Sequence, residues 1–229
     1  YKAAVAEEAL QAGAKIVNLS FTSPTDCFSL FEAVQQAYRK GALVVAAAGN
    51  EFQSGNPVLY PAAYPHVLSV ASVNLQMQAS AFSNENIAVD LAAPGEGVPL
   101  ATPVAFDRDG QPDGITLGDG TSFAAPIVSG AAAWLMASRP KLRNGQVADL
   151  LRHTARDIAP AGYDAGTGYD LLDLPAALSA PTPATDPHEP NDGISFVDGS
   201  VFGKVASAVW RGQGKRLVRA TVDVVEDPV

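Results

Sequence analysis

The side chain with the clearest chemical potential is Ser122, which stands where a glycine-rich turn meets a run of small apolar residues. If a helix begins there, its first backbone N–H groups point into the space before it and favour an anion. Pro126 has no N–H, so the carbonyl of Ser122 loses its usual helical hydrogen-bond partner. Ser122 or Thr121 could equally serve only as the helix N-cap. Position alone therefore leaves a nucleophile and a cap both open.

A second polar side chain, Asn50, follows an apolar run, three alanines and a glycine. A carboxamide at the end of a buried strand could donate a hydrogen bond to the oxyanion that forms during acyl transfer. Gly49-Asn50 is also a common turn sequence, so this position too has two readings.

A serine nucleophile needs a base, and the chain has three histidines. His66 begins an expected strand, His153 lies on an expected helix, and His188 lies in a proline-rich stretch. None of them is a convincing base. Residues 120 to 124 nearly match the GxSxG elbow of α/β-hydrolases, but His153 comes too soon after the serine for that arrangement.

Composition argues against several other functions. The chain carries 24 acidic and 15 basic residues, a net charge of -9, which disfavours nucleic acid and anionic membranes as partners. Residues 123 to 137 are apolar but too few to span a bilayer. A single cysteine, Cys27, supports neither a disulfide framework nor a thiolate metal cluster. No phosphate-binding loop or metal-ligand spacing is present, so we identify no cofactor.

The elements that must position these residues alternate between strand and helix. Such alternation predicts an α/β fold, a parallel sheet with helices on both faces and ligand sites at the carboxyl ends of its strands. Ser29 and Glu32 form an expected capping box at the start of one helix. The expected helices are 3–14, 29–38, 122–138, 144–156 and 174–178, and the expected strands are 15–21, 42–50, 66–73 and 89–95.

The organisation of the chain predicts one main domain and a remnant. We expect the main domain at residues 1–179, a Pro-rich linker at 180–193, and the start of a β-rich C-terminal module, truncated, at 194–229. The first residue is not Met and the opening stretch does not read as a signal peptide, so we expect the main domain to be incomplete at its N-terminus.

Five segments resemble the subtilisin-like serine proteases, the subtilase family of peptidases. "GTSFAAPIVSG" (120–130) is similar to the serine signature of that family at every specified position, and the others are "IVNLSF" (16–21), "VVAAAGNE" (44–51), "LAAPG" (91–95) and "GTGYDLLDLPAAL" (166–178). The resemblance implies a subtilisin-like fold in which Ser122 is the nucleophile. It also implies that Asn50 donates its amide to the oxyanion, together with the backbone N–H of Ser122.

The same resemblance implies a substrate site for an extended peptide. Ser20, Phe21 and Thr22 match the strand that pairs with the substrate backbone, although the family usually has glycine where Thr22 stands. The residues that would line the pocket for the residue before the scissile bond are Ala47, Ala48, Gly49 and Glu51 on one wall and Leu59 and Ala62 on the other. Because Leu59 should shorten this pocket, we expect a small or medium apolar residue in it.

The Asp and His of the family's triad belong upstream of these segments, and this chain contains neither motif. The resemblance therefore implies a secreted, extracellular endopeptidase whose upstream part supplies both, with this fragment alone inactive. The alternative is a catalytically inactive, subtilase-like peptide-binding protein. Family members often bind structural calcium, but no ligand set is legible here.

Overall fold

The computed structural model describes residues 8–107, 109–111, 113–158 and 161–183, and the backbone of residues 207–212 and 216–221. The predicted linker lies outside the described residues from position 184 onward. Within the segment predicted to be β-rich, β7 (Ser207–Gly212) and β8 (Arg216–Thr221) pair antiparallel. The boundaries assigned to the linker and the module stay predictions.

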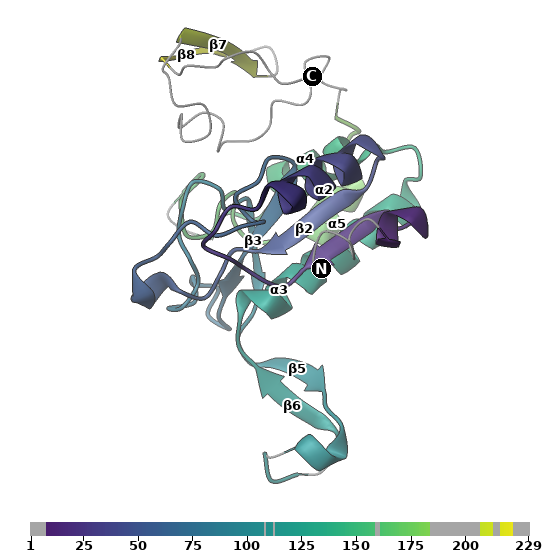
Figure 1. Ribbon diagram of the computed structural model, residues 1–229, viewed down its shortest axis with the longest axis vertical. Coiled ribbons are helices and arrows are strands. Elements are labelled where there is room, and N and C mark those ends of the chain that lie inside the picture. Colours follow the sequence, from purple (N-terminus) through teal and green to yellow (C-terminus); the bar gives the residue numbers. More distant parts are fainter. Residues whose placement is uncertain are drawn as a thin grey trace.

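A four-stranded parallel sheet forms the centre of the molecule (Figure 1). Its strands, in sheet order, are β1 (Ile16–Leu19), β2 (Leu43–Ala47), β3 (Val67–Val73) and β4 (Leu91–Pro94). Every residue of β2 and β3 is buried, because both faces of the sheet are covered. Continuous apolar runs are typical of such strands.

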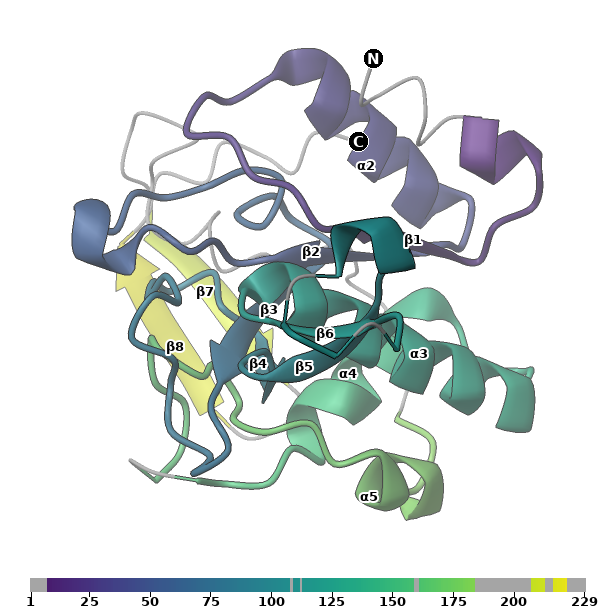
Figure 2. The ribbon, with the colours of Figure 1, turned by 90° about the horizontal axis from the view of Figure 1, so that it is seen from below.

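Helices cover the two faces, as Figure 2 shows. One face carries α2 (Phe28–Arg39); the other carries α3 (Thr121–Ser138), α4 (Asn144–His153) and α5 (Leu174–Ser179). The side chains of β2 point alternately to the two faces. Val44 and Ala46 join the core beneath α2, whereas Val45 and Ala47 join the core beneath α3. The predicted α/β architecture is confirmed.

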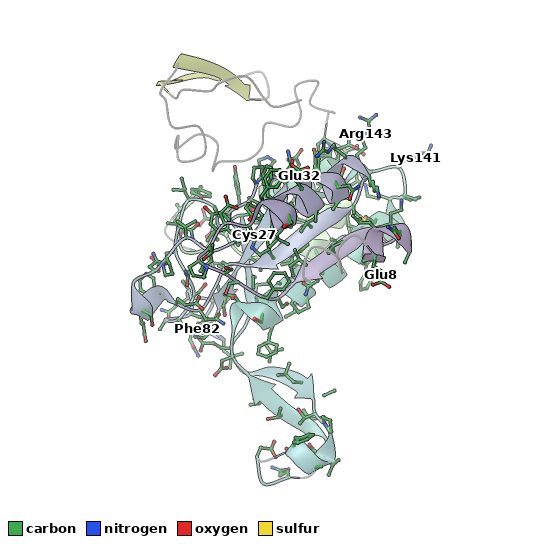
Figure 3. All side chains as sticks on the ribbon, in the orientation of Figure 1. Glu8, Cys27, Glu32, Phe82, Lys141 and Arg143 are labelled. Carbon is green, nitrogen blue, oxygen red and sulfur yellow. The ribbon has the colours of Figure 1, made fainter. Side chains whose placement is uncertain are left out.

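Three predicted helix boundaries are wrong. The helix expected at 3–14 ends at residue 11, and its residues 3–7 lie outside the described part of the chain. The chain is extended at Cys27, which is the N-cap of α2, and it is already helical at Phe28. Ser29 therefore lies within the first turn, its hydroxyl meets the sulfur of Cys27, and the predicted capping box with Glu32 does not form. Cys27 and Glu32 both lie on the solvent side of α2 (Figure 3).

Helix α4 ends at His153, three residues before the predicted end at 156. Beyond it, Arg156 exchanges backbone hydrogen bonds with Leu171, at 2.8 and 3.1 Å. This bridge takes the chain out of the helix.

Helix α3 is the apolar centre of its layer. By length and composition alone it could cross a membrane, but one face packs on all four strands, and Ala124, Ala125, Val128 and Leu135 are fully buried. We therefore describe it as a core helix.

A hairpin that the sequence did not predict precedes α3. Strands β5 (Val98–Ala101) and β6 (Ile115–Gly118) pair antiparallel and project away from the sheet (Figure 1). The strand pattern is short and the connecting segment is long, which hid the hairpin from periodicity. Strand β6 leads directly into the turn at Gly120.

Candidate active site

Three segments that are far apart in sequence meet at the carboxyl end of the sheet. Ser20 follows β1, Asn50 follows β2, and Ser122 opens α3 after β6. The hydroxyl of Ser122 donates to the carbonyl of Ser20 at 3.4 Å, and the side chain of Asn50 accepts from Thr121. The structure thus brings together the alcohol and the carboxamide that the sequence singled out.

Ser122 lies in the first turn of α3 and is partly exposed. The N-cap of this helix is Gly120, at φ 152° and ψ 151°, and no side chain of the turn caps it. The N-cap reading of Ser122 and Thr121 is therefore wrong. Gly120 takes a conformation that residues with a Cβ rarely adopt, and it turns the chain from β6 into the helix.

The orientation of the Asn50 carboxamide is fixed by Thr121. Its Oδ1 accepts hydrogen bonds from both the backbone N–H and the hydroxyl of Thr121, each at 2.9 Å. Thr121 is fully buried, and its hydroxyl also accepts the N–H of Gly49 at 3.2 Å. Since Oδ1 is held by these donors, the Nδ2 donor of Asn50 is turned the other way.

Two donors lie near the position that a side chain on residue 120 would occupy. A Cβ built on Gly120 would lie 3.4 Å from Asn50 Nδ2, 3.7 Å from the backbone N of Ser122 and 3.8 Å from Asn50 Oδ1. Because residue 120 is glycine, no side chain of its own fills that position. Within the described part of the chain neither donor has an acceptor of its own, and the positive end of the α3 dipole points the same way. This position suits an oxyanion.

A buried asparagine that sequence reasoning missed supports the loop around Asn50. Asn84 is fully buried; its Oδ1 accepts the N–H of Glu51 at 2.6 Å and its Nδ2 donates to the carbonyl of Pro57 at 2.7 Å. The carboxylate of Glu51 in turn accepts the N–H of Asn50 at 2.7 Å. Nothing in the local sequence around Asn84 signals this role.

The expected substrate strand is tied to the expected pocket. Ser20, Phe21 and Thr22 leave β1 partly buried, and the next residue, Ser23, exchanges backbone hydrogen bonds with Tyr60 at 2.9 and 2.8 Å. Tyr60 lies between the two residues expected on the far wall. The expected substrate strand is thereby tied to the far wall of the pocket.

Leu59 fills the space above Gly49. It is 2% exposed, and a Cβ on Gly49 would come within 2.3 Å of its Cδ1. Ala47, Ala48 and Ala62 turn their side chains into the core, so they can offer only main chain to a ligand. Their role in binding stays a prediction.

The described histidines lie away from Ser122. His66 precedes β3 at the amino end of the sheet, where its ring stacks on Tyr38 at a centroid distance of 3.9 Å. His153 ends α4 and meets the ring of Tyr169 edge-on at 5.3 Å. His188 lies outside the described residues. Among those residues, no group of His, Cys, Asp and Glu side chains could hold a metal ion.

Two groups, the thiol of Cys27 and the hydroxyl of Tyr64, have shifted pKa values. Hydrogen bonds from the backbone of Leu30 and from the side chain of Ser29 lower the pKa of the exposed thiol of Cys27. Burial, followed by its hydrogen bond to Asp26, raises the pKa of the Tyr64 hydroxyl well above its ordinary value. Neither group reaches Ser122 by any contact that the structure shows, so neither is a candidate base.

Comparison with known proteins identifies similar chains. The model of the subtilase family of peptidases matches residues 1–169. Subtilisin from Bacillus pumilus is 35% identical over 175 residues, which are 75% of this chain and 59% of that protein. The minor extracellular protease Epr of Bacillus subtilis is 35% identical over 161 residues, 70% of this chain and 24% of Epr.

Among solved structures, fervidolysin from Fervidobacterium pennivorans, described as a keratinolytic enzyme related to subtilisin, superimposes with a TM-score of 0.71. It is 30% identical, and the match covers 80% of this chain and 29% of that chain. The predicted subtilisin-like fold is confirmed. The chain spans 42% to 59% of the length of the subtilisins it matches.

Proposed function

The chain belongs to the subtilase family of serine-type peptidases, and we propose that it is the nucleophile-bearing part of a serine endopeptidase. The observation that carries the proposal is that the Asn50 carboxamide, whose Oδ1 is held by Thr121, and the backbone N of Ser122 both lie within 4 Å of the position that a Cβ on Gly120 would take. Two neighbouring hydrogen-bond donors without an acceptor of their own are what the oxyanion of a tetrahedral intermediate requires.

In the proposed reaction, Ser122 Oγ attacks the carbonyl carbon of the scissile peptide bond, and its proton passes to a histidine. The carbonyl oxygen becomes anionic and accepts hydrogen bonds from Asn50 and Ser122. The histidinium then protonates the leaving amine, and water releases the acyl group by the same steps in reverse order. No cofactor is needed for this chemistry.

We propose that the base and its orienting carboxylate come from outside the described residues. His66 and His153 are held by Tyr38 and Tyr169 away from the serine. We therefore propose that a histidine and an aspartate precede this chain in the complete protein. The 229 residues alone are then expected to be inactive or nearly so.

The proposed substrate is an extended peptide or protein segment that pairs with residues 20 to 22 as an added strand. Because Leu59 occupies the volume over Gly49, the residue before the scissile bond is expected to be small or medium-sized and apolar. We also propose an extracellular location, supported by the similarity to a protease named extracellular.

A second candidate function is peptide binding without catalysis. Thr22 favours it, since a threonine side chain takes up room beside a paired substrate where glycine would leave it free. Endopeptidase and binding protein differ in one testable property, the reactivity of Ser122.

A fluorophosphonate probe tests the proposal on the complete protein. We expect stoichiometric labelling that disappears in the Ser122→Ala variant and is absent from the 229-residue chain. A folded complete protein whose Ser122 takes no label would favour the binding protein. Labelling and ester hydrolysis by the 229 residues alone, lost in Ser122→Ala, would contradict the need for an upstream base.

A further inference from the structure

The carbonyl of Ser122 has an unusual hydrogen-bond partner. In an uninterrupted α-helix it would accept the N–H of residue 126, but residue 126 is a proline. It accepts instead the hydroxyl of Ser20, at 2.9 Å, from 102 positions earlier in the chain. This carbonyl is partly buried, and the hydroxyl of Ser20 takes the place of the missing helical donor.

Two further side chains orient that hydroxyl. Asn18 Nδ2 donates to Ser20 Oγ at 2.9 Å, and Ser129 Oγ donates to Asn18 Oδ1 at 3.0 Å. The donors all run in one direction, from Ser129 through Asn18 and Ser20 to the carbonyl of Ser122. This series of hydrogen bonds begins and ends on α3, on either side of Pro126, and passes through residues at the end of β1.

We propose that Ser20, oriented by Asn18 and Ser129, is a positioning residue for the nucleophile, and we call these three residues the carbonyl relay. This inference rests on the proposed peptidase function. The relay acts through the backbone of Ser122. This role belongs to the side-chain hydroxyl of Ser20. It is separate from the expected pairing of the Ser20 main chain with the substrate.

The relay joins the two parts of the site that must stay in register. Ser20 lies on the strand expected to hold the substrate, and Ser122 lies on the helix that carries the nucleophile and one oxyanion donor. The bond from Ser20 Oγ and the reverse contact from Ser122 Oγ to the carbonyl of Ser20 couple strand and helix directly. Displacements of about 1 Å at a reacting atom can cost on the order of 100-fold in rate.

Kinetics of the complete protein test the relay. We expect Ser20→Ala to lower kcat by about 10-fold, the order expected for one lost hydrogen bond, while KM changes by less than about twofold because main-chain pairing is kept. Ser20→Thr retains the hydroxyl and should keep most of the wild-type kcat. The matched control is Ser179→Ala, which removes a hydroxyl bonded to the carbonyl of Pro175 in α5. It should leave both constants unchanged.

A second substitution separates positioning from packing. Pro126→Ala supplies an N–H that can bond to the carbonyl of Ser122, so the hydroxyl of Ser20 becomes redundant. In that background Ser20→Ala should lower kcat by less than about twofold. An equal loss in both backgrounds, or a Ser20→Thr enzyme as slow as Ser20→Ala, would overturn the relay.

A spectroscopic readout distinguishes failure of the relay from failure of the proposed function. In the complete protein labelled with carbonyl-¹³C serine and ¹⁵N phenylalanine, the Ser122–Phe123 correlation is identified by its loss in Ser122→Ala. We expect its carbonyl resonance to move upfield in Ser20→Ala and to stay in place in Ser20→Thr. An unmoved resonance in Ser20→Ala overturns the relay alone. If the resonance moves in Ser20→Ala but the wild-type protein shows no turnover, the peptidase function is overturned, and the catalytic role of the relay with it.

Discussion

The two ends of the central sheet treat their polar side chains in opposite ways. At the carboxyl end, Asn50 Nδ2 and the backbone N–H of Ser122 lie near each other at Gly120, and neither has an acceptor among the described residues. At the amino end, Asp90 and Arg152 are buried against each other: Arg152 Nε donates to Asp90 Oδ1 at 2.9 Å, and the N–H of Ser69 donates to Asp90 Oδ2 at 2.7 Å. The fold thus pairs Asp90 with Arg152 at one end and leaves two donors without an acceptor, among the described residues, at the other.

The difference shows how to separate structural polar residues from functional ones. A buried ion pair such as Asp90 with Arg152 needs both partners, and its energetic role is local to folding. Neighbouring donors without an acceptor of their own serve no purpose in the unliganded protein. Substitutions at the carboxyl end should therefore affect turnover with little effect on stability, and those at the amino end should do the reverse.

The largest expected effect is that of Asn50→Ala on turnover in the complete protein. We expect kcat to fall by about 10²–10³ with KM nearly unchanged, a magnitude known for the equivalent donor in subtilisin itself and so not independent of the family. The matched control is Asn144→Ala at the amino end, where Nδ2 bonds to the carbonyls of Tyr38 and Ala42. Asn144→Ala should lower stability and spare kcat; the opposite pattern would erase the contrast between the two ends.

The second effect is on stability. Arg152→Met leaves Asp90 buried without its cation, and we expect a loss of about 3 kcal/mol in the free energy of unfolding, measured by urea denaturation. Adding Asp90→Asn should recover most of that loss, because the uncompensated charge is gone. A double variant as unstable as Arg152→Met would show that the uncompensated charge of Asp90 does not cause the loss of stability.

The third effect is on substrate preference at the carboxyl end. Leu59→Ala opens the volume over Gly49, so the preference between phenylalanine and alanine before the scissile bond should shift toward phenylalanine by about 10-fold in kcat/KM. Paired peptide substrates that differ only at this residue measure the shift in the complete protein. An unchanged ratio would remove Leu59 from the pocket. Leu150→Ala, the same change at a buried leucine of α4, is the control and should leave the ratio unchanged.

The sequence predicted the strands of the sheet well, because β2 and β3 are continuous apolar runs that only a sheet covered on both faces would bury. It also placed Ser20 and Asn50 at one edge, since the carboxyl ends of parallel strands meet there. It failed at Ser29, where a capping-box pattern lay one turn inside a helix whose start was set by the extended backbone of Cys27.

The residues that hold the site were beyond sequence reasoning. Thr121 and Asn84 act through hydrogen bonds to segments 71 and 33 positions away, and no local pattern encodes such contacts. Pro126 did leave a signal, an unpartnered carbonyl at Ser122, but only the fold could show that Ser20 supplies the partner.

The smallest expected effect compares two acids near the amino end of β4. Asp90 is neutralised by Arg152. Asp170 is 2% exposed, and burial, reinforced by Asp164 and Asp157, raises its pKa against the hydrogen bond from Thr167. The folded protein therefore binds a proton at Asp170 more readily than the unfolded chain. Its contribution to stability declines as pH rises above the ordinary pKa of an aspartate, about 4.

Asp170→Asn isolates this contribution, because asparagine tolerates the φ of 80° and still offers an oxygen to Thr167. Relative to wild type, the variant should gain stability between about pH 4 and pH 7, as measured by urea denaturation at several pH values. Asp173→Asn, at the N-cap of α5, is the control, since its carboxylate is only partly buried and accepts the N–H of Ala176. A wild-type protein that becomes more stable than Asp170→Asn across this range would show that hydrogen bonding outweighs burial at Asp170. Both acids near the amino end, Asp90 and Asp170, would then be stabilised in their charged form.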